Sequence, residues 1–221
     1  DEDRRVTIPG FYEGVSELSP QVRSQWDALG FNDAEFLGDI GLKDGLGERG
    51  RSTLERTWSR PTCDVNGIFG GYTGKGAKTV IAAHATAKVS FRLVSRQNPE
   101  KIAAAFAEFV QARLPSGCRA VFETHGVNPA IEVSEHSRYL TAASRGLQSV
   151  FAKEPLLIGT GGSIPAVGAI QRILGMDCLL VGFGLDDDCV HSPNEKFELE
   201  CYRNSIRSQA TILHELAQLS R

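Results

Sequence analysis

Hydrophobic and polar residues alternate along residues 80–94, a period-two pattern that is typical of half-buried β-strands. The predicted strand presents Thr86, Lys88, Ser90 and Arg92 on one face and Ala85, Ala87, Val89, Phe91 and Leu93 on the other. The glycine-rich segment 74–79 just before it lacks both the spacing of a phosphate-binding P-loop and a helix directly after it, so we expect a hairpin-type turn. Residues 119–124 alternate again and predict a further strand.

Helical spacing of apolar residues predicts an amphipathic helix over residues 99–114. Proline and glycine over 115–117 suit its end, Pro99 suits its first turn, and its inward-facing residues are Ile102, Phe106, Phe109 and Val110. Earlier in the chain, Ser19 and Asn32 are typical helix starts, but repeated glycines over 38–50 interrupt any long element. We therefore expect short helices and loops in residues 1–60.

A second unit begins near Ser134 and mixes helical spacing with short apolar runs. Residues 139–151 and 199–219 predict helices, whereas the continuous apolar runs 156–158 and 178–183 predict buried strands. A glycine-rich turn follows the first run and leads into a helix that ends near Leu174, with Ser163 as the expected N-cap and Pro165 in the first turn. This turn either presents backbone N–H groups to an anion or is a tight crossover without a ligand.

The order of these elements predicts a fold that combines α/β and α+β architecture. Residues 61–134 run strand, strand, helix, strand, which predicts a small α+β sheet with helices on one side, preceded by the irregular and helical residues 1–60. Residues 135–221 combine helices with buried strands, as α/β domains do. Because a small sheet has free edges, pairing of an edge with a second copy is an expected route to a homodimer.

Charge and composition narrow the function classes. A formal net charge of -3 argues against a nucleic-acid surface, and no apolar run is long enough for a membrane span. The five cysteines are odd in number and form no CxxC pair, which favours reduced thiols and a cytoplasmic protein over a disulfide framework. No signal peptide is visible, but the chain starts with Asp1 rather than Met, so we expect it to be part of a longer protein.

The loop of residues 184–197 carries the candidate chemistry, because it follows a predicted core strand and precedes a helix. Its His191 offers a neutral imidazole, the commonest side-chain ligand of zinc. The carboxylates of the three aspartates at 186–188 would either neutralise a divalent ion or orient the imidazole ring without binding the metal. Cys189 is either a further sulfur donor or a small residue that fills the loop. From spacing alone, an exposed acidic turn with an incidental histidine is the alternative.

Four short stretches carry the most specific pattern in the chain. They are, in order, Lys78-Thr-Val-Ile81, Ala87-Lys-Val-Ser-Phe-Arg-Leu-Val94, Gly161-Gly-Ser-Ile-Pro165 and His191-Ser-Pro-Asn-Glu-Lys196. Together they resemble the dinuclear-zinc metallopeptidase family of aminoacylase, carnosinase and glutamate carboxypeptidase type, and in particular its carnosinase-like dipeptidase branch. Weaker similarity extends back to Ile8, so the resemblance covers most of the chain.

The resemblance implies a two-domain enzyme in which a catalytic α/β domain with two zinc ions carries a smaller, ferredoxin-like α+β lid that dimerises. Residues 1–134 would form most of the lid, and residues 135–221 the carboxyl-terminal part of the catalytic domain. The guanidinium of Arg92 would suit the terminal carboxylate of a substrate. By similarity, His191 would ligate one zinc ion, and the substrate contacts would come from Thr79, Arg92, Asn128, Gly162 and Ser163.

The chain departs from the family pattern at three points. Many relatives carry Arg-Glu before the Gly-Gly-Ser-Ile-Pro turn, where this chain has Gly159 and Thr160, and relatives often have histidine where it has Asn128. The other metal ligands and the general base of the family lie upstream of the position that corresponds to Asp1. By resemblance, this chain would therefore be inactive alone.

The activity that the resemblance implies for the complete enzyme is hydrolysis of dipeptides or small peptides by a metal-activated water. A deacylase of the same family, acting on an N-acyl amino acid, would use the same residues. A non-catalytic dimerisation or binding module is the third interpretation, favoured by Thr160 and by the start of the chain at Asp1.

Overall fold

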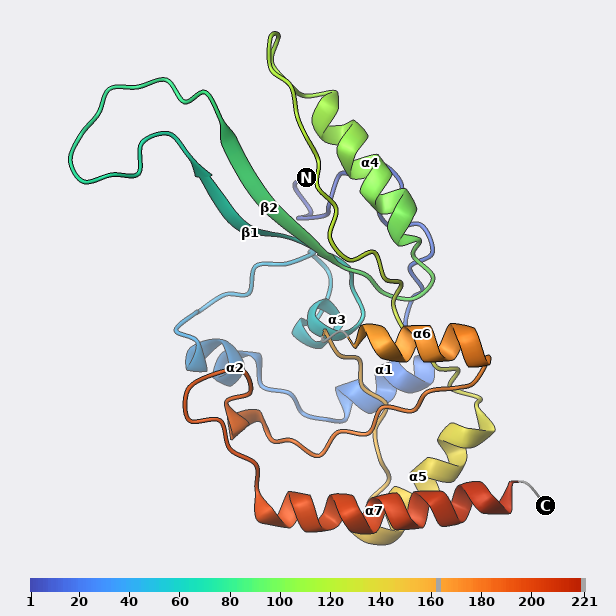
Figure 1. Ribbon diagram of the computed structural model, residues 1–221. Coiled ribbons are helices and arrows are strands. Elements are labelled where there is room, and N and C mark those ends of the chain that lie inside the picture. Colours follow the sequence, from blue (N-terminus) through green and yellow to red (C-terminus); the bar gives the residue numbers. More distant parts are fainter. Residues whose placement is uncertain (162–163, 220–221) are drawn as a thin grey trace. The chain divides into compact units, whose positions relative to one another are not determined.

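The computed structural model describes residues 1–161 and 164–219, and within them it contains helices and one antiparallel hairpin (Figure 1). The elements in chain order are α1 (Pro20–Asp27), α2 (Asp33–Asp39), α3 (Thr53–Trp58), β1 (Thr62–Gly70), β2 (Ala85–Arg92), α4 (Pro99–Gln111), α5 (Arg138–Phe151), α6 (Pro165–Leu174), the 3-10 helix η1 (Asp186–Asp188) and α7 (Leu199–Gln218). Gly162 and Ser163, two of the predicted site residues, lie outside the described residues.

The chain divides into two compact units, each with its own internal packing. Unit 1 comprises Asp1–Glu132 together with the described part of 158–163. Unit 2 comprises Val133–Leu157 together with the described residues from Ile164 onward.

The hairpin of β1 and β2 is the sheet of unit 1. Cys63 lies opposite Phe91 in this antiparallel pair, and the register shifts between Val65 and Gly67, where β1 has one extra residue. Such a β-bulge increases the local twist of a strand pair. The alternation predicted for β2 is confirmed over residues 88–92, where Val89 and Phe91 are partly covered and their polar neighbours are exposed. Ala85 and Ala87, predicted on the same face as Val89, are exposed.

The hairpin connection spans residues 71–84 and contains the glycine-rich segment 74–79, as predicted. The strand predicted over 80–94 is shorter in the structure, because pairing with β1 begins at Ala85 and ends at Arg92. Residues 80–84 have no partner strand within the described chain, so their alternation alone does not make them a strand.

A small apolar core lies where the base of the hairpin meets α4 and the N-terminal loop. Ile8, Phe11 and Ile102 are buried there, and the rings of Phe91 and Phe106 lie 5.3 Å apart between centroids. Ile102 and Phe106 are four residues apart on α4, so they share one face of the helix. This packing confirms the predicted inward face of α4.

Polar side chains begin the short helices that precede the hairpin. The Ser19 hydroxyl accepts a hydrogen bond from the Val22 N–H at the start of α1, and Asn32 does the same for the second helix. Ser52 and Glu55 form a reciprocal capping box at α3. The predicted starts of α1 and α2 are therefore confirmed, because each cap satisfies N–H groups that have no partner in the first turn.

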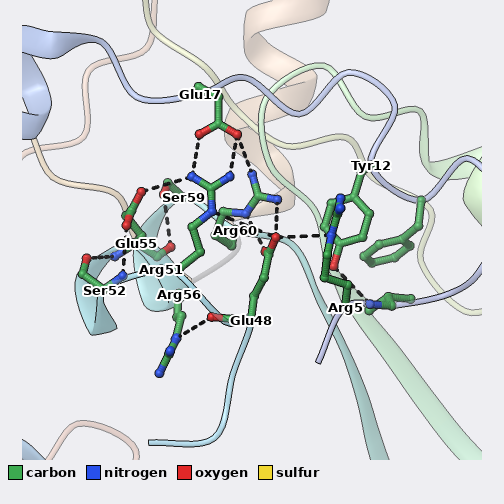
Figure 2. Close-up of polar contacts among 12 residues, drawn as sticks. Arg5, Tyr12, Glu17, Glu48, Arg51, Ser52, Glu55, Arg56, Ser59 and Arg60 are labelled. Carbon is green, nitrogen blue, oxygen red and sulfur yellow. Dashed lines mark hydrogen bonds and ion pairs between the residues drawn. The ribbon is translucent and has the colours of Figure 1, made fainter. Parts of the chain in front are cut away.

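Five charged residues form the arginine–glutamate cluster of unit 1, namely Glu17, Glu48, Arg51, Glu55 and Arg60 (Figure 2). Figure 2 shows the two guanidinium groups side by side, with Glu17 above them and Glu48 below. Arg51 reaches both Glu17 and Glu55, and Arg60 reaches both Glu17 and Glu48. The cluster thus connects four parts of unit 1: the segment before α1, the loop before α3, α3 itself, and the short connection from α3 to β1.

In unit 2, α5 packs closely against α7. A Cβ atom added at Gly146 would lie 2.8 Å from the backbone nitrogen of Ile212, so only glycine permits this approach. The Thr211 hydroxyl donates a hydrogen bond to the Gly146 carbonyl at 2.8 Å. Both helices were predicted, and their bounds agree with the prediction to within one residue.

The start of α6 corrects a predicted cap. The helix begins with Pro165 at its first position and ends at Leu174, as expected, but its N-cap is Ile164, which makes no side-chain cap hydrogen bond. The predicted N-cap, Ser163, lies outside the described residues.

Three predicted strands, at 119–124, 156–158 and 178–183, are irregular in the structure. A strand is stable only when its backbone groups bond to a neighbouring strand, and within the described residues none of these segments has one. Apolar side chains of these segments are accordingly exposed, as Val121, Ile158 and Leu180 show. The prediction of an alternating strand at 119–124 and the predictions of buried strands at 156–158 and 178–183 were therefore wrong.

Candidate metal-ligand loop and substrate-contact residues

His191 lies in the loop between η1 and α7, in unit 2. Its backbone has φ 61°, and its neighbours Cys189 and Asn194 have φ 52° and 64°. Residues other than glycine rarely adopt this left-handed region, which costs roughly 1–2 kcal/mol for each. The imidazole is solvent-exposed at this sharply turning segment.

Two residues that bracket His191, Asp188 and Lys196, hold this loop together. The Lys196 ammonium lies 3.0 Å from Asp188 Oδ1, and the Lys196 backbone N–H donates to the Asp188 carbonyl, also at 3.0 Å. The other carboxylate oxygen of Asp188 accepts the Leu185 N–H at 2.8 Å. Asp188 is only 2% exposed, although it lies in a surface loop.

Lys196 is surrounded by carboxylates, which stabilise its positive charge. Lys196 also contacts Asp187 at 3.1 Å and Glu198 at 3.0 Å. Hydrogen bonds to Glu198, Asp188 and Asp187 raise the pKa of Lys196, while the Leu185 N–H and the Lys196 ammonium lower the pKa of Asp188. The pair is therefore charged across the physiological pH range.

These contacts change the interpretation of the three aspartates. Asp187 and Asp188 were candidates for neutralising a metal ion, but in the structure they bind Lys196. Sequence reasoning missed this role of Lys196, although the lysine ends the same family-like stretch that His191 begins. The signal that could have found it is the placement of opposite charges on either side of the histidine.

The donor set of the loop suits a metal ion only in part. An exposed neutral imidazole is an appropriate zinc ligand, but a zinc site needs about three protein ligands. Among residues 1–161 and 164–219, no group of three or more His, Cys, Asp or Glu side chains is placed to hold a metal. The described residues therefore contain no complete zinc site.

The predicted substrate contacts of unit 1 lie at different parts of that unit. Thr79 is exposed in the hairpin connection, and Arg92 is exposed at the opposite end of β2, paired across the sheet with Thr62. At about 3.3 Å per residue, β2 separates its own two ends by roughly 23 Å. Asn128 is exposed in the irregular segment after α4. The structure does not bring these residues into one pocket, and His191 belongs to the other unit.

Comparison with known proteins identifies the class. Residues 17–118 match the peptidase dimerisation domain of the M20 family. Over these residues the chain thus carries an M20 peptidase dimerisation domain, and its homologues include dipeptidases, as the resemblance implied. The mixture of helices and strands agrees with the predicted α/β and α+β fold class.

The alignments with two relatives span nearly all of this chain but less than half of each relative's length. The Cys-Gly metallodipeptidase of Schizosaccharomyces pombe is 30% identical over 97% of the chain and 46% of the relative. The human Beta-Ala-His dipeptidase is 28% identical over 99% of the chain and 44% of the relative.

Solved structures give the same result. An M20 family metallo-carboxypeptidase from Sulfolobus solfataricus superposes with a TM-score of 0.82 at 29% identity, over 96% of this chain and 48% of that one. Human carnosine dipeptidase 1 superposes with a TM-score of 0.70 at 26% identity, over 99% of this chain and 46% of that one.

In the described part of the chain, no helix is long and apolar enough to cross a membrane.

Proposed function

We propose that this chain is the lid and carboxyl-terminal part of a metal-dependent dipeptidase, with residues 1–134 as most of the lid and 135–221 as part of the catalytic domain. The observation that carries the proposal is the similarity of 97–99% of the chain to metallodipeptidases, combined with the exposed His191 in a loop of defined geometry. Dipeptides of the kind named for those relatives, Cys-Gly and β-Ala-His, are the proposed substrates.

Two zinc ions are the proposed cofactor of the complete enzyme, where they would lower the pKa of a bound water and polarise the scissile carbonyl. His191 would bind one ion through a ring nitrogen. Because the described residues contain no complete zinc site, and the resemblance implies that the general base lies upstream of Asp1, we propose that the chain has no peptidase activity by itself.

The substrate contacts are proposed for five residues of the chain. The Arg92 guanidinium would bind the terminal carboxylate with two parallel hydrogen bonds, and Thr79 and Asn128 would donate further hydrogen bonds through side chains that are exposed in the structure. Gly162 and Ser163, which lie outside the described residues, would line the pocket beside the scissile bond.

A homodimer through the lid and a cytoplasmic location complete the proposal. The outer half of the hairpin exposes the apolar side chains of Val65, Ile68 and Phe69, with Ile68 and Phe69 on opposite faces of β1, and a second copy would cover one of these faces. All five cysteines are free thiols in the structure, which fits a reducing compartment.

The proposal is tested in the protein that contains this chain. Metal content by mass spectrometry and dipeptide hydrolysis are measured for His191→Ala and for the control His214→Ala, which changes an exposed histidine of α7. We expect His191→Ala to lose about one zinc ion and nearly all activity, and the control to keep both. Full zinc content and turnover in His191→Ala would refute the ligand role.

A deacylase of the same family is the second candidate, supported by the same residues. A panel of dipeptides with free amino termini and the matching N-acyl amino acids separates the two. Hydrolysis of the acylated set alone would replace the dipeptidase proposal, whereas absence of zinc binding in the complete protein would favour a non-catalytic dimerisation module.

A further inference from the structure

The loop that carries His191 has an unfavourable backbone conformation that something in the structure must hold. Cys189, His191 and Asn194 are all left-handed within six positions, with φ of 52°, 61° and 64°. Strain of this kind persists only where the surroundings impose it. The backbone bond from the Ser192 N–H to the Cys189 carbonyl, 3.0 Å long, is local and does not tie the loop to anything outside it.

The two residues on either side of the loop close it at its base. Asp188 and Lys196 are joined twice, by the ammonium–carboxylate contact and by a backbone hydrogen bond, each 3.0 Å long. Through its second oxygen, Asp188 also accepts the Leu185 N–H. Seven residues, His191 among them, therefore form a closed loop whose two ends lie at a fixed separation.

We propose that Asp188 and Lys196 are positioning residues that hold the loop of residues 189–195 in the conformation that presents the His191 imidazole to its ligand. The inference deepens the proposed function, because it rests on His191 as a metal ligand. It assigns the acidic residues a role other than metal binding, since Lys196 neutralises Asp188 directly and reaches Asp187 and Glu198 as well.

Two geometric facts distinguish Asp188 from its neighbours. Its side chain is 2% exposed, whereas that of Asp187 is 74% exposed, so Lys196 binds one shielded and one open carboxylate. Within the described residues, Asp188 is also the one of the three aspartates whose side chain accepts a backbone N–H. Replacement of Asp188 thus removes both the charge partner of Lys196 and the acceptor of Leu185.

The test measures backbone amide hydrogen exchange over 189–195 in the metal-free full chain, with the amides of α7 as the internal reference. We expect Asp188→Ala and Lys196→Met each to accelerate exchange of the Ser192 amide, which is hydrogen-bonded to the Cys189 carbonyl, at least tenfold relative to α7. Asp188→Asn keeps an acceptor for the Leu185 N–H and is expected to give a smaller increase. Lys196→Arg keeps the positive charge, so it should keep the slow exchange that Lys196→Met loses.

The matched control is Asp186→Asn, which removes the same charge from an adjacent aspartate that makes no hydrogen bond to Lys196 within the described chain. It should leave exchange in the loop unchanged. Exchange that is equally slow in Asp188→Ala and Lys196→Met overturns the proposal, as does acceleration of the loop and of α7 to the same degree, which would indicate general destabilisation.

A second measurement connects the loop to the metal. In the complete protein, zinc affinity by competition with a chelator is expected to fall about 10- to 100-fold in Asp188→Ala and Lys196→Met, as for residues that orient a ligand. Unchanged affinity in both overturns the positioning role. Unchanged zinc affinity in His191→Ala would instead refute the ligand role of His191. The exchange experiment is done without metal, so its result on the loop conformation stands apart from that outcome.

Discussion

Two nitrogen atoms of Arg60 bind the two carboxylate oxygens of Glu48: Nε lies 2.7 Å from Oε2, and Nη2 lies 2.9 Å from Oε1 (Figure 2). Both side chains are almost fully covered, 6% and 9% exposed. Glu48 belongs to the loop before α3, and Arg60 lies two residues before β1. The pair therefore connects the irregular N-terminal part of unit 1 to the base of its hairpin.

Breaking this pair from one side should destabilise the protein. We expect Glu48→Gln to lower the free energy of unfolding by about 3 kcal/mol, because the Arg60 charge would stay buried without its main partner. Urea denaturation followed by circular dichroism measures the change. Glu215→Gln is the control, since it breaks the more exposed Arg145–Glu215 pair and should cost less than about 1 kcal/mol. Equal losses in the two variants would contradict the importance of burial.

Acid should weaken unit 1 through Glu17 and Glu55. The hydrogen bond from Arg51 lowers the pKa of Glu17 below its ordinary value of 4.5. Burial raises the pKa of Glu55, but hydrogen bonds from the Ser52 N–H and from Arg51 outweigh burial and lower it overall. A lowered folded-state pKa means that the stabilisation is complete above the unfolded value and is lost as pH falls through the folded value.

The expected result is a thermal midpoint that is constant near neutral pH and falls below about pH 4.5, the ordinary glutamate value. Glu17→Gln and Glu55→Gln should each flatten this acid limb, because the neutral amide takes up no proton. Glu108→Gln changes an exposed glutamate of α4 and should leave the limb unaltered. An acid limb of unchanged slope in both cluster variants would show that other carboxylates are responsible.

Gly146 should not tolerate a side chain. A Cβ at this position would lie 2.8 Å from the Ile212 nitrogen and 2.9 Å from its Cα, so α5 and α7 would have to separate. We expect Gly146→Ala to lower the free energy of unfolding by about 2 kcal/mol despite the higher helix propensity of alanine. Gly38→Ala in α2 has no atom within 4 Å of the new methyl group and should stabilise the protein by up to about 1 kcal/mol. Chemical denaturation of both variants makes the comparison, and a stabilised Gly146→Ala would disprove the close packing.

The proposed dimer should depend on the outer half of the hairpin. Ile68 is 75% exposed on β1, and we expect Ile68→Glu to shift the protein from dimer toward monomer, because a buried carboxylate without a partner is unfavourable. Analytical ultracentrifugation at several concentrations measures the shift. Leu46→Glu alters a similarly exposed residue outside the hairpin and should leave the dimer intact. A dimer of unchanged affinity in Ile68→Glu would place the interface elsewhere.

Arg92 should control substrate binding more than turnover. In the complete enzyme we expect Arg92→Met to raise KM for dipeptides about 100-fold, because the substrate carboxylate would lose its charged partner. Arg92→Lys keeps the charge but not the planar fork, so an intermediate KM is expected. Dipeptides with an amidated carboxyl end are the complementary probe, and they should bind Arg92→Met and the native protein equally. A selective fall in kcat instead would assign Arg92 to the chemical step.

Local chemistry predicted most of the helices. Ser19 and Asn32 begin helices in the structure because each satisfies backbone N–H groups of its own first turn. The inward face of α4 followed from the spacing of Ile102 and Phe106 in the same way. These features depend on neighbours a few residues away, and such neighbours are visible in the sequence.

Contacts between distant parts of the chain could not be predicted from the sequence. Glu48 and Arg60 became partners only once the chain before α3 had folded back on the start of β1. The apolar runs at 156–158 and 178–183 were compatible with strands, but a strand also needs a hydrogen-bonded neighbour, and within the described residues they have none.

The sequence by itself determined the capped helices, the alternating faces of β2 and the ordered set of stretches that relate the chain to M20 peptidases, because each depends on residue type and spacing. Only the tertiary structure decided that Arg60 pairs with Glu48, that α5 contacts α7 at Gly146, and that Lys196 forms ion pairs with two aspartates near His191. A contact of this kind depends on the separation of two side chains in space, which the folded backbone sets.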